Sequence, residues 1–437
     1  MDTAALATIV LLGGFVILMA LRVPISFALL LSTLGSALVS GTNLTVMINQ
    51  MVSGVSSYAL LAIPFFILMG EIMSAGGISE KIVDFANLLV GRFRGGLAYV
   101  NCLDSMFFGG ISGSAVADVS SLGSVVVPMM KKQGYTPEFS VALTVTTSCQ
   151  GVLIPPSHNM IIYALAASGL ASVNIEHLLM AGLVPGVSLG LSLMLLCFFM
   201  AERYKFPRGT VVSKGDRLRV LFNAILPLLT LVIIMGGVAA GIFTVTESAA
   251  FACLYTFLLT YVVFRSARIR DIGKVLRNTL KTLAVVLTLI GTAKAFAYMM
   301  SDLRIPDQIT AALLSVTQNK YVLLLIINLL LLLLGCFMDM APLIMIMTPI
   351  LLPVVLSPAI GMDPIHFGVM LIFNLAVGLC TPPVGSALFV GCAVGKTTLE
   401  KTAKAALPMF GMMFIVLMLV TYIPAITMWL PGVLFGK

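Results

Sequence analysis

The residues of this chain with the clearest chemical potential lie around two proline pairs, Pro155-Pro156 and Pro382-Pro383. Each pair interrupts an apolar segment that would otherwise continue as a helix. Because proline lacks an N–H, each pair leaves carbonyl oxygens unpaired four residues upstream. Na⁺ is a hard cation and prefers oxygen ligands. A break with free carbonyls and nearby hydroxyls therefore predicts a sodium site.

At the first break, hydroxyl groups come from a glycine-rich turn predicted at 109–114, which would be the tip of a hairpin. The half-helix that follows the break would direct its free N–H groups at an anionic substrate. The predicted sodium-binding residues are Ser112, Ser114, Gly151 and Pro155. The predicted substrate-binding residues are Gly113, Ser157, His158 and Asn159.

The second break repeats this arrangement, with an acid at a hairpin tip predicted at 335–342. A carboxylate at membrane depth is costly and marks a functional site by default. The spacing places Asp339 at the position of Ser112 in the first copy. The predicted sodium-binding residues are Asp339, Gly378, Thr381 and Pro383. The predicted substrate-binding residues are Gly385 and Ser386.

Two further ionisable residues each have two interpretations. Asp118 follows the first tip by one helical turn, so it is either a functional acid or a cap or hydrogen-bonding group within the hairpin. Lys294 lies in an otherwise apolar span, where it either pairs structurally with an acid or contacts an anionic substrate.

The two breaks belong to a longer internal repeat. Five glycine and proline positions recur at a constant offset of 227 residues: Gly134 and Gly361, Pro137 and Pro364, Gly151 and Gly378, Pro155 and Pro382, and Pro156 and Pro383. Glycine and proline interrupt helices, so each half of the chain carries a broken helix at the same place. An apolar chain built from two such copies has the sequence pattern of a secondary transporter.

The composition indicates a membrane protein. The chain is 60% hydrophobic and only 10% charged, and apolar segments of about 20 residues, long enough to cross a bilayer, follow one another with short gaps. These runs are continuous rather than alternating, which excludes a β-barrel. The predicted fold is an all-α polytopic membrane protein with two inverted-topology repeats, each with a re-entrant helical hairpin and a discontinuous helix.

The predicted division is a first repeat over 1–202, a cytoplasmic linker over 203–219 and a second repeat over 220–437. Each repeat contains an amphipathic arm, a hairpin and a broken span, in that order. These segments are 43–57, 95–132 and 137–170 in the first repeat, and 268–281, 320–360 and 364–395 in the second. After each arm come a span, at 59–75 and 282–300, and a short helix, at 79–91 and 305–316.

The net charge of +8 indicates how the chain is oriented in the membrane rather than an affinity for nucleic acid. With ten spans and two re-entrant hairpins, most of the 25 lysines and arginines fall on one side, as the positive-inside rule requires. That side is the cytoplasm, where the basic residues would contact anionic lipid. The N-terminus is then periplasmic, and the first apolar run stays as a span because it lacks the basic start of a cleavable signal.

The sequence also argues against an enzyme. It contains no Walker motif, no HExxH and no serine–histidine or cysteine–histidine pairing. The seven cysteines lie in apolar stretches without metal-ligand spacing. We therefore expect no cofactor and no transition metal, with Na⁺ as the coupling ion.

Several motifs resemble those of one transporter family. The run FGGISGSAVADVSSLGSVVVPMMKKQGY at 108–135 resembles the first hairpin of the large, DctM-like membrane subunit of tripartite ATP-independent periplasmic (TRAP) transporters. RVPISFAL at 22–29, IPPS at 154–157, GIFTVTES at 241–248 and TPPVG at 381–385 are also similar. The resemblance implies a bacterial inner-membrane permease and Na⁺-driven uptake of an organic acid by an elevator mechanism. It further implies a small, DctQ-like membrane subunit and a DctP-like periplasmic substrate-binding protein.

The function predicted from the whole sequence is the large permease subunit of a Na⁺-coupled secondary transporter that imports a dicarboxylate or a sugar acid. One alternative is a stand-alone Na⁺/dicarboxylate symporter with the same inverted hairpins, which would work without a binding protein. Another is a channel with the hairpins as re-entrant filter loops, although no symmetric filter signature is visible.

The charge distribution generates a test of orientation. We expect Lys132→Cys, in a background without native cysteines, to react with a membrane-impermeant maleimide only after the inner face is exposed. A cysteine near Gly361 should react from outside in intact cells. Labelling of position 132 in intact cells would contradict the predicted topology.

Overall fold

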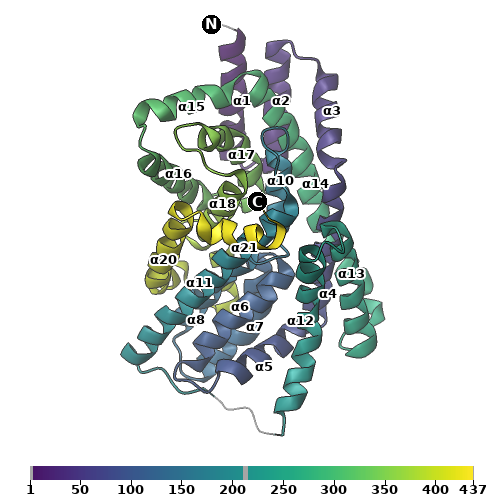
Figure 1. Ribbon diagram of the computed structural model, residues 1–437, viewed down its shortest axis with the longest axis vertical. Helices are drawn as coiled ribbons and strands as arrows, with labels where there is room; N and C mark the ends of the chain where they lie inside the picture. The colour runs from purple at the N-terminus through teal and green to yellow at the C-terminus, as the bar shows by residue number, and fades with distance from the viewer. Residues whose placement is uncertain (1–2, 210–214, 437) are drawn as a thin grey trace.

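The computed structural model describes residues 3–209 and 215–436, and these fold almost entirely into α-helices (Figure 1). The centre of the predicted linker, 210–214, lies outside the described residues. Within these described residues, seven helical segments are long and apolar enough to cross a membrane: Thr3–Ala20, Tyr58–Ala75, Ile175–Arg203, Arg217–Ala239, Val245–Val263, Ile269–Asp302 and Leu399–Tyr422. The predicted all-α polytopic fold is confirmed.

The helices of the two halves follow the predicted order. The first half contains α1 (Thr3–Ala20), α2 (Ile25–Ser40), α3 (Leu44–Val55), the 3₁₀ turn η1 (Tyr58–Leu61), α4 (Ala62–Ala75), α5 (Ile78–Val90), α6 (Gly96–Ser112), α7 (Ala115–Lys132), α8 (Pro137–Ser148), α9 (Gln150–Leu153), α10 (His158–Ala167) and α11 (Ile175–Arg203). The second half contains α12 (Arg217–Ala239), α13 (Val245–Leu258), the π-helical turn η2 (Leu259–Val263), the 3₁₀ turn η3 (Ile269–Asp271), α14 (Ile272–Asp302), α15 (Ile305–Val316), α16 (Lys320–Gly335), α17 (Met340–Leu356), α18 (Pro364–Cys380), α19 (Ser386–Gly395), α20 (Leu399–Tyr422) and α21 (Ala425–Phe435).

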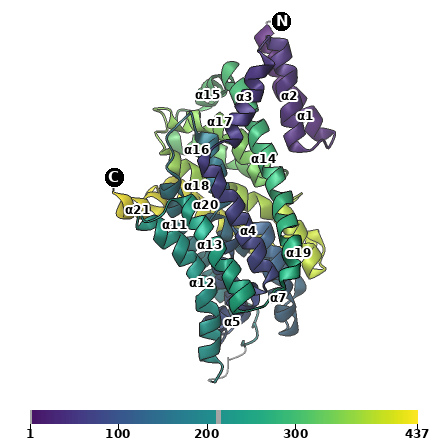
Figure 2. The ribbon, with the colours of Figure 1, turned by 90° about the vertical axis from the view of Figure 1, so that its right-hand side faces the viewer.

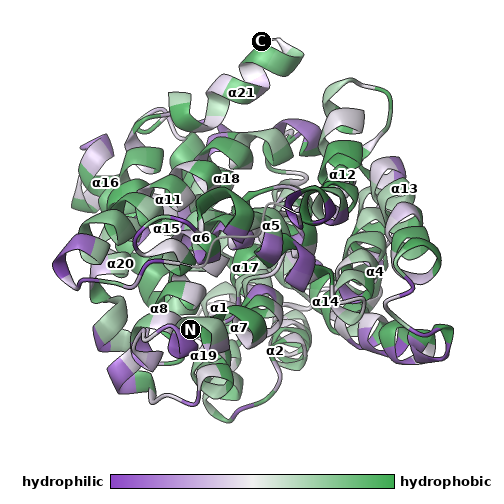
Figure 3. Ribbon diagram, turned by 90° about the horizontal axis from the view of Figure 1, so that it is seen from below, coloured by the Kyte–Doolittle hydropathy of each residue, from purple (hydrophilic) through white to green (hydrophobic). Residues whose placement is uncertain are grey.

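The outer helices carry apolar side chains toward their surroundings. Leu218 and Phe222 on α12 and Leu407 on α20 are more than 60% exposed, and these helices are coloured largely hydrophobic in Figure 3. A water-soluble protein would cover such helices with charge. The exposed apolar bands are therefore the surface expected of a protein that spans a membrane.

One predicted boundary is wrong. The arm at 268–281 and the span at 282–300 form a single helix, α14, which continues from Ile272 to Asp302. The change from charged to apolar residues alters the surroundings of the side chains but does not interrupt the i→i−4 hydrogen bonds, and no proline lies between them. In the first half, by contrast, the arm α3 ends before η1. Helix α14 packs along α2, α3 and α4 (Figures 1 and 2).

The two hairpins are α6–α7 and α16–α17, which lie in the lower and upper parts of Figure 1. The predicted turn at 109–114 is too long, because α6 continues through Ser112 and only Gly113 and Ser114 form the tip. Gly113 has a φ of +63°, a conformation that glycine adopts without strain. The second tip is Cys336–Asp339, within the predicted 335–342.

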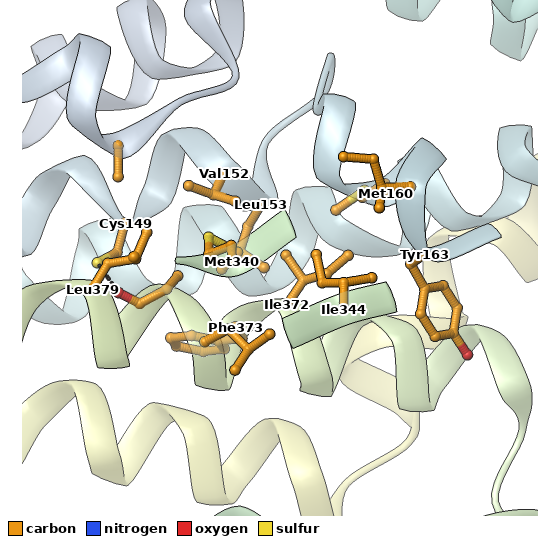
Figure 4. Close-up of a cluster of buried hydrophobic side chains, with 14 of the residues drawn as sticks. Cys149, Val152, Leu153, Met160, Tyr163, Met340, Ile344, Ile372, Phe373 and Leu379 are labelled. Carbon is orange, nitrogen blue, oxygen red and sulfur yellow. Dashed lines mark hydrogen bonds between the residues drawn. The ribbon is translucent and has the colours of Figure 1, made fainter. Parts of the chain in front are cut away.

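Each broken helix contacts the hairpin of the other repeat. Helix α10, which follows the first break, packs on α17, and α19, which follows the second break, packs on α7. Figure 4 shows Met160 and Tyr163 of α10 beside Ile344 of α17 and Ile372 of α18. This exchange joins both hairpins and both broken helices into one packed unit, which we call the core unit (α6–α10 and α16–α19).

Buried hydrogen bonds reproduce the 227-residue repeat. In the first half, Thr147 Oγ1 donates to Asn101 Oδ1 at 3.3 Å. At the equivalent positions of the second half, Asn374 Nδ2 donates to Asn328 Oδ1 at 2.8 Å. All four side chains are buried, and a hydrogen bond is what makes a buried polar group tolerable. The same bond, from the broken helix to the first hairpin helix, therefore fixes the hairpin in both halves.

Candidate functional site

The first hairpin tip rests on the first break. Gly109 of α6 and Gly151 of α9 lie backbone to backbone, so a Cβ on either glycine would collide with the other. At the tip itself, a Cβ on Gly113 would lie 2.7 Å from the carbonyl oxygen of Pro156 and 3.4 Å from His158 Nδ1. The structure therefore brings Gly113 against Ser157 and His158, and Gly109 against Gly151.

The second tip rests on the second break in the same way. A Cβ on Gly378 would lie 2.6 Å from the Cα of Gly335. The backbone N–H groups of Val384 and Gly385 both donate to the carbonyl of Cys336 at 3.2 Å, which ties the break to the tip. Each repeat thus forms a junction between a hairpin tip and a helix break, which we call junction 1 and junction 2.

The two tips share a capping residue, but not the one that the sequence spacing selects. Asp339 is the N-cap of α17, and its carboxylate accepts from the N–H of Met340 at 3.0 Å. Ser114 is the N-cap of α7, and its hydroxyl accepts from the N–H of Ala117 at 3.4 Å. Asp339 therefore corresponds to Ser114 rather than to Ser112, since the chain takes 13 residues from Asn101 to Ser114 but only 11 from the equivalent Asn328 to Asp339.

The proline pairs alter the hydrogen bonding of the backbone carbonyls at both junctions. At junction 1, the carbonyls of Gly151 and Val152 have no donor four residues later, because Pro155 and Pro156 lack an N–H. At junction 2, the N–H of Thr381 takes the carbonyl of Gly378 at 3.0 Å.

The hydroxyl hydrogen of Thr381 goes to the carbonyl of Val377 at 2.7 Å, which leaves the lone pairs of Oγ1 for another ligand. Pro155 is buried and Pro383 is exposed. The backbone oxygens and hydroxyls of both junctions match the ligand preference of a hard cation.

The half-helices after the breaks present unpaired serine hydroxyls. Ser157 is the N-cap of α10, and Ser386 is the first residue of α19. Neither Oγ has a hydrogen-bond partner, although both lie in buried surroundings. His158 is half-buried and Asn159 is buried. Both N-termini thus combine free N–H groups with an available hydroxyl, the chemistry of a carboxylate site.

Lysines hold the opposite ends of the same half-helices. Lys294 Nζ donates to the carbonyl of Ser168 at 3.3 Å and to its hydroxyl at 3.2 Å, at the C-cap of α10. At the equivalent position, Lys131 Nζ donates to the carbonyl of Gly395, the last residue of α19. A cation at a helix C-terminus is favourable to the helix dipole. Lys294 therefore has a structural partner in this arrangement, a helix end rather than an acid.

The two junctions differ in access. At junction 1, residues 154–157 are all buried, and Gly70 of α4 lies against Ser112 of the tip. At junction 2, Asp339 and Pro383 are exposed, and Phe337 and Val384 are 55% and 44% exposed. The structure is therefore closed around the first tip and open around the second.

Asp118, singled out in the sequence, belongs to a buried acid pair whose other member, Asp104, escaped sequence reasoning. Asp104 of α6 and Asp118 of α7 are 0% and 1% exposed, and none of their carboxylate oxygens has a hydrogen-bond partner. Asp118 therefore does not act as a cap. Asp104 could have been found from its place in an apolar hairpin segment, since an acid within a membrane segment is a functional candidate.

Comparisons with known proteins agree with this architecture. The family model described as "Tripartite ATP-independent periplasmic transporter, DctM component" matches residues 12–426. The chain is 41% identical to "Uncharacterized protein YgiK" of Salmonella typhimurium, over 97% of each chain. It is 36% identical to "Sialic acid TRAP transporter large permease protein SiaM" of Vibrio cholerae, over 97% of this chain and 98% of that one. Among solved structures, the YdaH transporter of Alcanivorax borkumensis matches with a TM-score of 0.61 at 13% identity, over 89% of this chain and 90% of that one; this last similarity concerns the fold alone.

The backbone contact at junction 1 generates a prediction. We expect Gly109→Ala to push the tip off the break, because the added methyl meets backbone that cannot move aside as a side chain can. Transport should fall at least about tenfold while the protein still inserts into the membrane, since the loss is confined to the junction. The matched control is Gly411→Ala on α20, where an added Cβ has no neighbour within 4 Å. Equal transport by both variants would contradict the tip-on-break contact.

Proposed function

Because the chain belongs to the DctM component family of tripartite ATP-independent periplasmic transporters, we propose that it forms the path along which a Na⁺ gradient drives uptake of an organic acid. The observation that carries the proposal is the pair of junctions. Two hairpin tips rest on two helix breaks, and the prolines of each break remove N–H donors from carbonyls upstream. Inverted repeats with broken helices are the usual framework of secondary transport.

The substrate is proposed to be a carboxylate. The free N–H groups of α10 and α19, with the unpaired hydroxyls of Ser157 and Ser386, favour an anion without a lysine or arginine at the tips. The name of the Vibrio cholerae relative, a sialic acid permease, fits the same class, a sugar acid. A dicarboxylate presents the same group, so the site chemistry favours organic acids in general.

The proposed partners follow from the family. A tripartite system supplies a periplasmic binding protein, which would deliver the acid, and a small membrane subunit. We place the complex in the bacterial inner membrane with the N-terminus periplasmic, as the charge distribution predicts. The exposed apolar faces of α12 and α20 offer room for a second membrane subunit or for lipid.

The proposed movement is that of an elevator. The core unit would move as one body, since each broken helix packs on the hairpin of the other repeat. Helices α1–α4 and α12–α14 would stay fixed, because α14 packs along α2, α3 and α4 and α13 packs on α4 and α12. In such a motion the closed junction and the open junction exchange roles between two packed states.

The alternative that shares this architecture is a stand-alone Na⁺/dicarboxylate symporter. The two are separated by uptake into proteoliposomes with and without the binding protein. Uptake at full rate from free substrate, with no binding protein present, would favour the symporter. A channel would instead show a current that does not saturate with substrate.

One prediction from the proposed function concerns sodium binding at junction 2. We expect Asp339→Asn to raise the Na⁺ concentration for half-maximal uptake about tenfold or more, because it removes a charged ligand. An asparagine oxygen still accepts from the N–H of Met340, so the α17 cap remains. The matched control is Asp363→Asn, which changes the N-cap of α18 away from the tips. An unchanged Na⁺ dependence in Asp339→Asn would contradict the assignment of Asp339.

A further prediction concerns the proposed elevator movement of the core unit. Ser74 Oγ of α4 lies 3.0 Å from Ser121 Oγ of α7, so cysteines at these positions can form a disulfide. In a background without the seven native cysteines, we expect Ser74→Cys/Ser121→Cys to lose transport on oxidation and to regain it on reduction.

The control for this cross-link keeps only the native pair Cys149 and Cys380, whose sulfurs are 2.9 Å apart within the core unit. Oxidation of this pair should leave the movement possible, because both cysteines would travel together. Full transport by the oxidised Ser74→Cys/Ser121→Cys protein would show that α4 moves with the core unit and would refute this form of the elevator.

A further inference from the structure

The buried acids Asp104 and Asp118 lie inside the first hairpin (α6–α7), which we call hairpin 1, beneath junction 1. Asp118 Oδ2 would lie 3.7 Å from a Cβ on Gly109, the glycine that contacts the break. Asp104 and Asp118 lie on α6 and α7, the two packed helices of this hairpin, and all four of their carboxylate oxygens lack a hydrogen-bond partner. Two unpaired carboxylates in a dry interior cannot both stay charged without a counter-charge.

The groups beside the pair offer acceptors rather than donors. The Ser105 hydroxyl, beside Asp104 on α6, donates to Thr147 Oγ1 at 3.1 Å. The single hydrogen of the Thr147 hydroxyl is in turn shared between Asn101 Oδ1 at 3.3 Å and the carbonyl of Leu143 at 2.9 Å. Both hydroxyls therefore have lone pairs to spare, while their hydrogens are used elsewhere. Carboxylates surrounded by further oxygen acceptors have the composition of a cation site.

No ion pair neutralises these acids. Among the residues that the structure describes, neither carboxylate forms a salt bridge with a lysine, arginine or histidine. The protein supplies no internal counter-ion.

The fold does not require acids at these positions. Counted from the equivalent asparagines Asn101 and Asn328, the second repeat has Leu331 where the first has Asp104. Counted from the equivalent N-caps Ser114 and Asp339, it has Leu343 where the first has Asp118. Both leucines are buried, at 0% and 1% exposure. The second hairpin thus has an apolar pair at these positions. An apolar pair would also cost less free energy in the first hairpin than two buried carboxylates.

We propose that Asp104 and Asp118 bind a Na⁺ inside hairpin 1, at a third cation site that has no counterpart in the second repeat. The ion would bridge α6 and α7 below the tip, with the Ser105 and Thr147 hydroxyls as further oxygen ligands. It would hold the two hairpin helices together and so keep Gly109 against Gly151. This site is separate from the junctions and does not depend on sodium binding there.

The test counts ions on the purified full-length protein. The probe is ²²Na⁺ at equilibrium, with thermal unfolding in NaCl against choline chloride as a second readout. We expect Asp104→Leu/Asp118→Leu to bind about one Na⁺ fewer per chain and to lose most of the Na⁺-dependent rise in unfolding temperature. In choline chloride this variant should unfold no earlier than the wild type, because it removes two buried charges.

Two further variants keep the result interpretable. Asp118→Asn preserves the shape of the side chain and should also lose one Na⁺, even if the double variant does not fold. Asp302→Asn, at the exposed end of α14, should bind as many ions as the wild type. Asp339→Asn should retain the Na⁺ at the acid pair. The number of Na⁺ ions bound by each variant therefore distinguishes an error in the junction sites from an error in the acid-pair site.

Wild-type Na⁺ binding by both acid-pair variants would overturn the proposal. A second result would also overturn it. If the variants bind as many Na⁺ ions as the wild type but lose a pH dependence of the unfolding temperature that the wild type shows, protons rather than Na⁺ neutralise the pair.

Discussion

The contact on which the rest of this structure depends is the meeting of two backbones without side chains between them. At junction 1, Gly109 lies against Gly151, and at junction 2, Gly335 lies against Gly378. Only glycine permits such an approach. It brings a hairpin tip onto a helix break, where proline has already freed backbone oxygens. Irregular backbone at membrane depth is tolerated when it is buried in protein or lines a cavity.

The two junctions are parts of one body. Cys149 Sγ donates to the carbonyl of Ala376, 227 residues away, and Cys380 Sγ donates to the carbonyl of Val145, at 3.0 and 3.1 Å. A residue that contacts its own repeat equivalent lies at the axis that relates the repeats. Since α10 and α19 also pack on the opposite hairpins, a displacement at one junction is transmitted through close packing to the other.

The sequence predicts the parts of this architecture that depend on local backbone chemistry. The breaks at Pro155 and Pro382 and the helix ends next to the tips follow from proline and glycine, whose effects do not need tertiary context. The boundary between arm and span at 281 fails because a change in side-chain character does not end a helix. The correspondence between Asp339 and Ser114 does not follow the constant offset of 227 residues, because it depends on where α7 and α17 begin. The acid pair of hairpin 1 requires the fold, since only burial shows that its carboxylates lack partners.

The central claim is that Na⁺ is held where the hairpin tips rest on the helix breaks. Hydrogen exchange of the purified protein in NaCl against choline chloride tests it most directly, because backbone that binds an ion opens less often. The account predicts slower exchange in NaCl for peptides that cover 109–117, 151–159, 335–343 and 378–387, with no change in α1 and α2. Protection that is absent from these segments, or that appears equally in α1 and α2, would contradict it.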